Sequence, residues 1–281
     1  MTDDAVDHAD GSVDHADGSV DHEGADENAD GAEDEDSGTY EYDASCAPGD
    51  PRMKDLLCGG RIEVLGRMPW SSNATFLVEV QEGPLHAPAV YKPERGEQPL
   101  WDFPPGLWRR EVAAHELSEQ LGFGLVPPTV VRADAPLGTG SLQAFVPARF
   151  HEHYFTMRDR DELGAALRQL CAFDLVANSA DRKGGHCLLD EDDRVWAIDN
   201  GLCFHEDLKL RTVIWDFAGE PIPAEVAGAL TALLDAGVDG RLRELLSGPE
   251  AVGIVDRAAA LLSTGRFPHD PTGRRHPWPL V

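Results

Sequence analysis

The spacing of apolar residues changes once along this chain, and that change limits what the chain can fold into. Between residues 61 and 147, apolar side chains alternate over short runs separated by Gly, Pro, Ser and Asn, a pattern typical of strands joined by turns. From residue 161 to 265, they recur every three or four positions over longer runs, which is the helical period. A β-rich half followed by a helical half predicts an α+β fold with a cleft where the halves join.

Individual elements follow from the same patterns. In the first half we expect strands near 61–65, 76–80 and 87–93, two more within 126–147, and a helix at 107–122. In the second half we expect helices at 161–179, 224–237, 240–246 and 250–265. The expected lobes are therefore residues 53–147, rich in strands, and residues 148–281, rich in helices.

The first 52 residues differ from both lobes in composition. Residues 1–45 contain 17 Asp and Glu and no Lys or Arg, so they hold more than half of the net charge of −27. The heptapeptide VDHADGS occurs at 6–12 and again at 13–19. A segment so charged and so poor in large apolar groups cannot offset its ordering entropy, so we expect residues 1–52 to be a disordered acidic tail. The alternative, divalent-cation binding by the Asp/His repeats, lacks the ligand spacing of a defined site.

Composition argues against several classes of function. The chain has no basic stripe of the kind that binds nucleic acid. No apolar run approaches the roughly 20 residues that span a bilayer, and the acidic N-terminus lacks the pattern of a signal peptide. The five cysteines form no C-x-x-C pair, which indicates free thiols in a reducing compartment. We therefore expect a cytoplasmic protein with no nucleic-acid partner and no stable membrane insertion, and the sequence does not indicate its oligomeric state.

Two aspartates flank a short hairpin pattern. Asp181 precedes the apolar run HCLL, Asp199 follows the run RVWAI, and the acidic turn DEDD separates the runs. Because a hairpin brings its two ends together, both carboxylates are expected at the same open end. Two simpler interpretations exist: Asp181 forms a buried ion pair with Arg182, and Asp199-Asn200-Gly201 is an ordinary turn.

A lysine and a glutamate in the β-rich half add to the two aspartates of the hairpin. Lys92 ends the strand APAVYKP, and Glu111 lies near the start of the following helix. Phosphoryl transfer needs a lysine for the phosphates, a carboxylate that orients it, an aspartate at the acceptor and a ligand for magnesium. Lys92, Glu111, Asp181 and Asp199 supply these groups in the chain order of the kinase plan, and Lys92 and Glu111 are expected within about 4 Å of each other.

The motifs also resemble a known family. The blocks NSADRKGGHCLL and WAIDNGLCF resemble the catalytic and metal-binding loops of the phosphatidylinositol 3-/4-kinase superfamily, and those of type II phosphatidylinositol 4-kinases most closely. VYKPERGEQP is similar to the lysine strand of that family, and the resemblance covers about residues 60–220. It implies a bilobal protein-kinase-like fold that uses ATP and Mg²⁺.

The resemblance implies a role for each matching residue. Lys92 contacts the nucleotide phosphates, and Asp199 binds the metal. Glu111 as the partner of Lys92 is inferred from the expected structure and is not part of the motif match. Asp181 acts in the catalytic loop as base or acceptor-positioning group, with Lys183 beside the transferred phosphate. The resemblance also makes LQAFVP the hinge, with Gln143, Phe145 and Val146 as expected nucleotide contacts. Ser71 and Ser72 are expected to contact the nucleotide for a different reason, because small residues in a turn between two strands leave backbone N–H groups free for an anion.

One residue departs from the family pattern. His186 stands where the lipid kinases have a metal-binding Asn. A neutral imidazole is a poorer ligand for Mg²⁺ than an oxygen donor and is better suited to Mn²⁺ or Zn²⁺. Three interpretations stay open: His186 binds metal beside Asp199, donates a proton to phosphate, or is a structural substitute. We therefore expect a metal site of Asp199 and His186 that takes Mg²⁺ or Mn²⁺.

The acceptor is expected to be a hydroxyl on a protein or a small molecule. The type II lipid kinases carry a cysteine-rich insertion that residues 93–110 lack, and anionic lipid repels an acidic chain. Lys209 and Arg211 are candidates to bind an anionic acceptor, or are simply solvent-facing charges. Two other functions are carried forward: a nucleotide-binding pseudokinase, and a metal-dependent hydrolase with Asp181, His186 and Asp199 as ligands.

Overall fold

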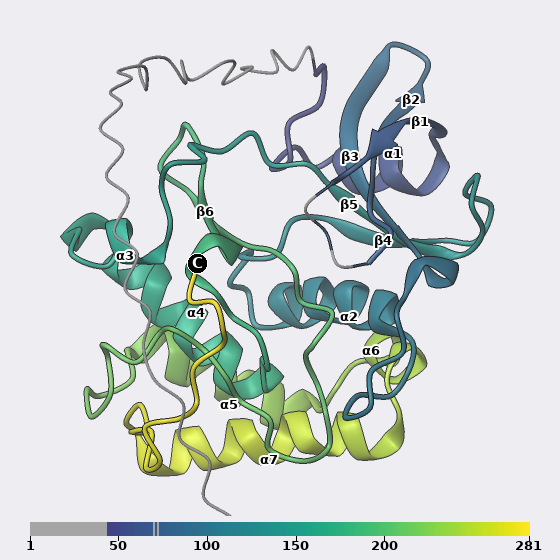
Figure 1. The fold of residues 1–281 in the computed structure, drawn as a ribbon. Coiled ribbons are helices and arrows are strands. Elements are labelled where there is room, and N and C mark those ends of the chain that lie inside the picture. The colour runs from purple at the N-terminus through teal and green to yellow at the C-terminus, as the bar shows by residue number, and fades with distance from the viewer. Residues whose placement is uncertain (1–43, 70, 72) are drawn as a thin grey trace, which may run out of the picture. The chain divides into compact units, whose positions relative to one another are not determined.

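The structure is a computed structural model that describes residues 44–69, 71 and 73–281. The described residues belong to one compact unit (Figure 1). Most of the expected acidic tail, residues 1–43, and the candidate Ser72 lie outside the described residues.

The β-rich half forms a five-stranded antiparallel sheet. Its strands lie in the order β1-β2-β3-β5-β4, where the bounds are β1 Arg61–Arg67, β2 Phe76–Glu82, β3 Leu85–Pro93, β4 Thr129–Arg132 and β5 Gly140–Ala144. Alternation along β3 buries Ala87, Ala89 and Tyr91 on one face. Because successive side chains point to opposite faces, Lys92 projects from the other face of the sheet.

Helix α1 (Met53–Gly59) and the residues before it cover the face that carries Tyr91. Met53, Leu56 and Leu57 pack with the buried residues of that face, as does Cys46, which is only 1% exposed. The backbone N–H of Ser45 also donates to the carbonyl of His86 at 3.0 Å. Contacts with the sheet therefore start before residue 52, where composition placed the boundary. Composition averaged over the segment did not reveal that Cys46 packs against the sheet.

Helix α2 (Leu107–Gln120) joins the sheet to the helical half. It contacts β4 and β5, while Ala113, Ala114 and Leu117 belong to the large core of the helical half. The carboxylate of Glu97 accepts hydrogen bonds from the N–H groups of Gly106 and Trp108, at 3.0 and 2.6 Å, and so caps the start of the helix. This cap fixes the first turns of α2, where Glu111 lies.

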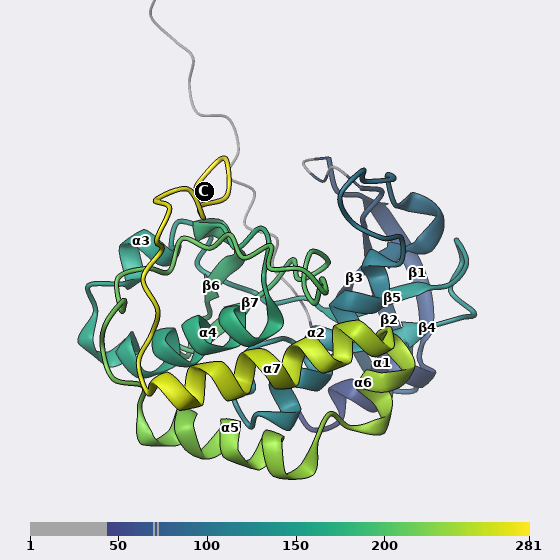
Figure 2. The same ribbon diagram turned by 90° about the horizontal axis from the view of Figure 1, so that it is seen from below.

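The long helix α7 runs along one side of the helical half (Figure 2). Helix α7 contacts α4, α5 and α6, and Ser247 and Glu250 form a capping box at its start. The bounds of these elements are α3 Tyr154–Met157, η2 Asp161–Leu163, α4 Gly164–Ala177, α5 Ala224–Ala236, α6 Gly240–Leu245 and α7 Gly248–Thr264, with η1 at Glu94–Gly96 in the other half. No helix among the described residues has the length and apolar character needed to cross a membrane.

A small hairpin stands between α4 and α5. The 3-10 turn η3 (Gly184–His186) leads into β6 (Cys187–Leu189), which pairs antiparallel with β7 (Val195–Ala197). The C-terminal segment returns to this hairpin, because the N–H of Gly184 donates to the carbonyl of Leu280 at 2.7 Å (Figure 1). The hairpin expected from the two apolar runs is therefore present.

Candidate active site

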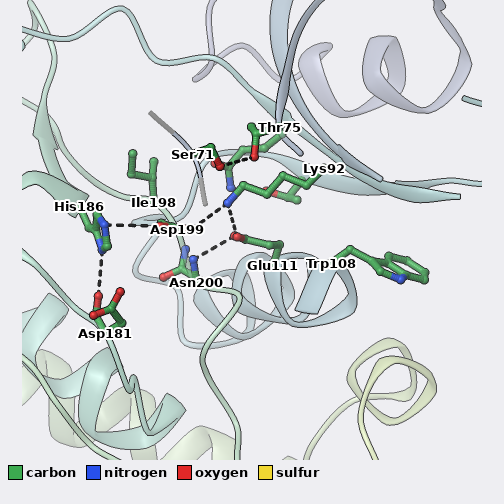
Figure 3. A network of polar contacts seen from close by, with 12 residues as sticks. Ser71, Thr75, Lys92, Trp108, Glu111, Asp181, His186, Ile198, Asp199 and Asn200 are labelled. Atoms are coloured by element: carbon green, nitrogen blue, oxygen red, sulfur yellow. Dashed lines mark hydrogen bonds and ion pairs between the residues drawn. The ribbon is translucent and has the colours of Figure 1, made fainter. Parts of the chain in front are cut away.

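Lys92 connects three separate parts of the chain. Its Nζ forms an ion pair with Glu111 of α2 and lies 2.9 Å from Oδ1 of Asp199, just after β7 (Figure 3). Glu111 is buried, with a side chain only 3% exposed, whereas Lys92 is 22% exposed. The ion pair expected from the sequence is present, and it places one cation beside two carboxylates.

Lys92 and its neighbouring carboxylates favour one another's charged forms. Burial lowers the pKa of Lys92, but the charges of Asp199 and Glu111 outweigh burial, so the pKa of Lys92 is raised. Lys92 in turn holds the pKa of Asp199 well below its usual range. At neutral pH the site therefore presents an ammonium group suited to phosphate next to a carboxylate suited to a metal ion.

Asp199 has an uncommon backbone conformation. Its φ of 56° lies in the left-handed region, which Asp tolerates better than most residues but at some cost. Residues held in this way often lie at functional sites because the surrounding structure must maintain them.

His186 lies between the two aspartates of the hairpin (Figure 3). Its Nδ1 is 2.9 Å from the carbonyl oxygen of Asp181, and its Nε2 is 3.4 Å from Oδ2 of Asp199. The N–H of Lys183 also lies 3.4 Å from Nδ1, a longer contact, so the favoured tautomer carries its proton on Nδ1 and donates to Asp181. Burial lowers the pKa of His186, which keeps the ring neutral and leaves a lone pair on Nε2 facing Asp199.

This arrangement fits a divalent cation. A metal-binding histidine usually donates its other ring N–H to a carbonyl or carboxylate, as Nδ1 of His186 does. The 3.4 Å between Nε2 and Oδ2 of Asp199 also matches two ligands of one ion with bonds of about 2.1 Å. Within residues 44–69, 71 and 73–281, no three His, Cys, Asp or Glu side chains converge on one point, so phosphate oxygens and water would supply the other ligands.

The structure brings Asp181 to the same end of the hairpin as Asp199. Asp181 lies on the loop between α4 and β6, and its carboxylate is 3.1 Å from Nζ of Lys183. Both side chains are partly exposed, at 27% and 22%. An acceptor can therefore reach Asp181 and Lys183 from solvent.

The three expected hinge contacts, Gln143, Phe145 and Val146, differ in the hydrogen bonds that they already form. The Gln143 side chain donates to Oγ1 of Thr129 at 2.8 Å and is buried, so it serves the sheet. The N–H of Phe145 donates to the carbonyl of Pro88 at 3.1 Å and is not free for a ligand. The N–H of Val146 forms no hydrogen bond within the described part of the chain, and its side chain packs with Leu188 and Trp196. Only Val146 is thus left with a backbone donor for a nucleotide base.

The other candidates mostly serve local structure. Oγ of Ser71 lies 2.7 Å from Oγ1 of the buried Thr75, within the β1–β2 connection (Figure 3). Arg211 donates from Nε to the carbonyl of Ala180 at 2.9 Å and lies 3.9 Å from Asp102, so it already has partners. The structure shows no side-chain partner for Lys209 among the described residues, so of these two cations it is the one whose charge is not already paired.

Four buried polar residues were missed in the sequence. Arg182 pairs with Asp174 of α4 at 3.0 Å, and not with Asp181 as the simpler interpretation had it. It also donates to the side chain of Asn200, and Thr212 donates to Asp174. A signal was available, since Asp174 interrupts the apolar stripe of an otherwise hydrophobic helix.

Sequence comparison relates the chain to a known protein. No protein-family model matches the chain. Protein Rv2133c of Mycobacterium tuberculosis is 40% identical over 263 residues, a match that covers 80% of this chain and 94% of that protein.

Solved structures are similar at much lower identity. Fam20 of hydra, solved with sugar, has a TM-score of 0.50 and 13% identity, over 74% of this chain and 86% of that one. The Golgi casein kinase has a TM-score of 0.47 and 15% identity over 76% of each chain. The Helicobacter pylori proinflammatory kinase CtkA has a TM-score of 0.42 and 11% identity, over 75% of this chain and 94% of that one. With the Fam20 match, the α+β, protein-kinase-like fold expected from the sequence is confirmed.

Proposed function

The chain belongs to the family of protein Rv2133c. From the geometry of the site we propose that it is an ATP-dependent phosphotransferase acting on a hydroxyl group. One observation carries the proposal: Lys92, Glu111 and Asp199 come from a strand, a helix and a loop and meet as a bonded group. A nucleotide's phosphates need a cation held beside a metal-binding carboxylate, and this group supplies both.

Lys92 binds the phosphates in this proposal, and Glu111 orients it. The salt bridge restricts the flexible side chain of Lys92, so less conformational entropy is lost when phosphate binds. Asp199 and His186 hold the divalent ion, which would neutralise charge on the phosphates when bound. The lone pair of His186 that faces Asp199 supports Mn²⁺ as well as Mg²⁺.

Asp181 and Lys183 act on the acceptor side. Asp181 accepts a hydrogen bond from the acceptor hydroxyl and takes or orients its proton. Lys183, whose ammonium lies 3.1 Å from that carboxylate, is close enough to balance negative charge on the transferred group. The partial exposure of both residues supports access by an acceptor.

The base of the nucleotide has an apolar neighbourhood at the hinge. Val146, Leu188 and Trp196 form a cluster, and Ala148 and Ile198 pack against it. The unused N–H of Val146 gives a base one hydrogen-bond donor beside that cluster. We therefore propose that adenine contacts the hinge through Val146.

The acceptor class and the closer family assignment are also proposals. The NSADR and IDNGL blocks support a phosphatidylinositol 3-/4-kinase-like branch. The acidic composition and the absence of a cysteine-rich insertion in residues 93–110 support a protein or small-molecule hydroxyl in preference to a lipid. The five free cysteines agree with action in the cytoplasm, where ATP is available.

The test combines thermal stability with product formation. The unfolding temperature of the wild-type protein is measured with ATP and Mg²⁺, Mn²⁺ or Zn²⁺. In separate samples of folded protein, ADP formation is measured in the presence of candidate acceptors. We expect stabilisation only when nucleotide and metal are both present, and its loss in Lys92→Met. Lys54→Met is the matched control, because Lys54 pairs with Glu116 away from the site. Unchanged nucleotide binding in Lys92→Met would contradict the proposal.

The pseudokinase alternative is motivated by His186, which replaces the expected Asn. It predicts stabilisation by nucleotide without ADP formation under any metal. The hydrolase alternative predicts stabilisation by metal alone, and the described residues give it no three-ligand cluster.

A further inference from the structure

Arg182 holds both residues that flank Asp199. Its Nη1 donates to the carbonyl of Ile198 at 2.7 Å, and its Nη2 donates to Oδ1 of Asn200 at 2.6 Å. Arg182 is itself the residue directly after Asp181. One guanidinium group therefore links the loop of the acceptor-side carboxylate to the loop of the metal-side carboxylate.

The position of this guanidinium is itself fixed. Its Nε donates to the carboxylate of Asp174 at 3.0 and 3.2 Å, and both side chains are fully buried. The backbone N–H of Arg182 donates to the carbonyl of Arg211, and its carbonyl accepts from Val213. Arg182 is thus held by its backbone and by its charge, so it offers Ile198 and Asn200 hydrogen-bond donors at a defined position.

The link continues into the other half of the fold. The N–H of Asn200 donates to Oε2 of Glu111 at 3.0 Å, while the other oxygen of Glu111 pairs with Lys92 (Figure 3). Asn200 is buried and contacts Arg182 and Glu111 at once. The chain of contacts from Asp174 to Lys92 is therefore continuous.

Stability alone does not explain a buried ion pair of this kind. Removing two charges from water is costly, and apolar replacements of similar size are often neutral or stabilising. A lysine could carry the charge, but only the planar fork of arginine reaches Asp174, Ile198 and Asn200 together. The benefit of Arg182 is therefore geometric.

We infer that Arg182 is a positioning residue that maintains the left-handed conformation of Asp199 and its separation from Asp181. This inference rests on the proposed function only for the claim that Asp199 binds metal. Without Arg182, the loop at residues 199–201 would sample other conformations, and Asp199 would bind the ion less well. Val146 lies outside this chain of contacts, in the cluster with Leu188 and Trp196, so binding of the nucleotide base would be affected less than binding of the metal.

The test replaces the ion pair while keeping the core apolar. The double variant Asp174→Leu/Arg182→Met is compared with wild type in three measurements. Urea unfolding gives stability, electron paramagnetic resonance detects Mn²⁺ binding in the presence of ADP, and amide hydrogen exchange reports on residues 199–201. We expect a folded protein with faster exchange at these residues and Mn²⁺ affinity lower by about tenfold or more, as for other residues that orient metal ligands.

Two further variants complete the design. Arg168→Met/Glu220→Leu removes a different ion pair of α4 that touches neither loop, and it should leave exchange and Mn²⁺ affinity unchanged. Arg182→Lys keeps a charge opposite Asp174, so it decides the question if the double variant does not fold. Wild-type exchange and Mn²⁺ affinity in a folded double variant, or in a folded Arg182→Lys, would overturn the inference. Failure of wild type to bind Mn²⁺ with ADP would instead contradict the proposed function, and exchange at 199–201 would still test Arg182.

Discussion

His186 and Asp199 face each other, and Nε2 of the ring lies 3.4 Å from Oδ2 of the carboxylate. The carbonyl of Asp181 holds the other ring nitrogen, so the ring has one favoured orientation. A nitrogen donor at this position favours Mn²⁺ over Mg²⁺ more than the oxygen of an Asn side chain would.

The first prediction follows from this pair. In His186→Asn, stabilisation by ADP with Mg²⁺ should rise relative to stabilisation by ADP with Mn²⁺, because an amide oxygen is the better ligand for Mg²⁺. We expect the ratio of the two apparent affinities to change by about tenfold, within the range for altered metal surroundings. Thermal unfolding at increasing metal concentration measures it. His151→Asn, at an exposed site, serves as control, and an unchanged ratio in His186→Asn would exclude His186 as a ligand.

The two aspartates should respond differently to neutralisation. Asp199→Asn should abolish metal-dependent nucleotide binding and leave the fold intact, because it removes the carboxylate beside Lys92. Asp181→Asn should keep that binding but lower the rate of transfer by roughly 10²- to 10⁴-fold, the usual contribution of a general base. Calorimetry with ADP and Mn²⁺ and an assay of ADP formation separate the two effects. Asp192→Asn, in the exposed hairpin turn, is the control. Transfer at the wild-type rate in both site variants would refute the assignment.

Truncation should distinguish the acidic segment from the residues that pack on the sheet. Removal of residues 1–43 is expected to leave the unfolding temperature and nucleotide binding unchanged, since composition predicts no contribution to the core. Removal of residues 1–52 should lower the free energy of unfolding by about 1–3 kcal/mol, because it also removes the buried Cys46 and the hydrogen bond of Ser45. Chemical denaturation of both truncated chains gives the comparison. A large loss from the shorter deletion would show that residues 1–43 contribute to the folded state.

His115 should make the fold less stable in mild acid. Burial lowers the pKa of His115 even though its Nδ1 contacts the carbonyl of Val126 at 3.2 Å. The unfolded chain, with an ordinary histidine pKa of about 6.5, takes up a proton that the folded chain does not. The contribution of His115 to the free energy of unfolding is therefore fully present above about pH 6.5. It is lost as the pH falls below that value, by up to about 1.4 kcal/mol per pH unit for one proton. His186, whose pKa is also lowered by burial, acts in the same direction.

The measurement is the free energy of unfolding between pH 5 and pH 7. His115→Asn keeps a donor for Val126 but does not titrate, so the dependence on pH should become shallower than in wild type. The same slope in both proteins would show that the folded chain protonates His115 as readily as the unfolded chain does.

Local sequence patterns predicted the fold well where apolar side chains recur at a single spacing, every second residue in strands or every third to fourth in helices. Alternation placed Lys92 at the end of a strand, and helical spacing placed Glu111 near the start of a helix, as the structure has them. The hairpin needed only two apolar runs and a turn. These features depend on residues that are close in sequence, and for that reason they can be predicted without the tertiary structure.

Features that depend on tertiary packing could not be predicted in this way. The sequence offered only the neighbouring Asp181 as an alternative partner for Arg182, but the packing of α4 brings Asp174 to it from eight positions earlier. The N–H of Phe145 was expected to meet a nucleotide, yet the continuation of β5 beside β3 directs it to Pro88. In each case a partner from another element satisfied a buried group that the sequence left open.

Trp196 gives the apolar cluster at the hinge an optical property. Its indole ring is only 2% exposed, it packs with Val146 and Leu188, and the guanidinium of Arg194 lies 3.7 Å from its ring centroid. The emission of an indole depends on nearby charge and on the polarity around the ring, and a base bound at Val146 would alter both. The protein therefore contains an intrinsic fluorophore next to its proposed adenine pocket. Because the chain has six tryptophans, the part of a nucleotide-induced change in emission that comes from Trp196 is the part that is lost in Trp196→Phe.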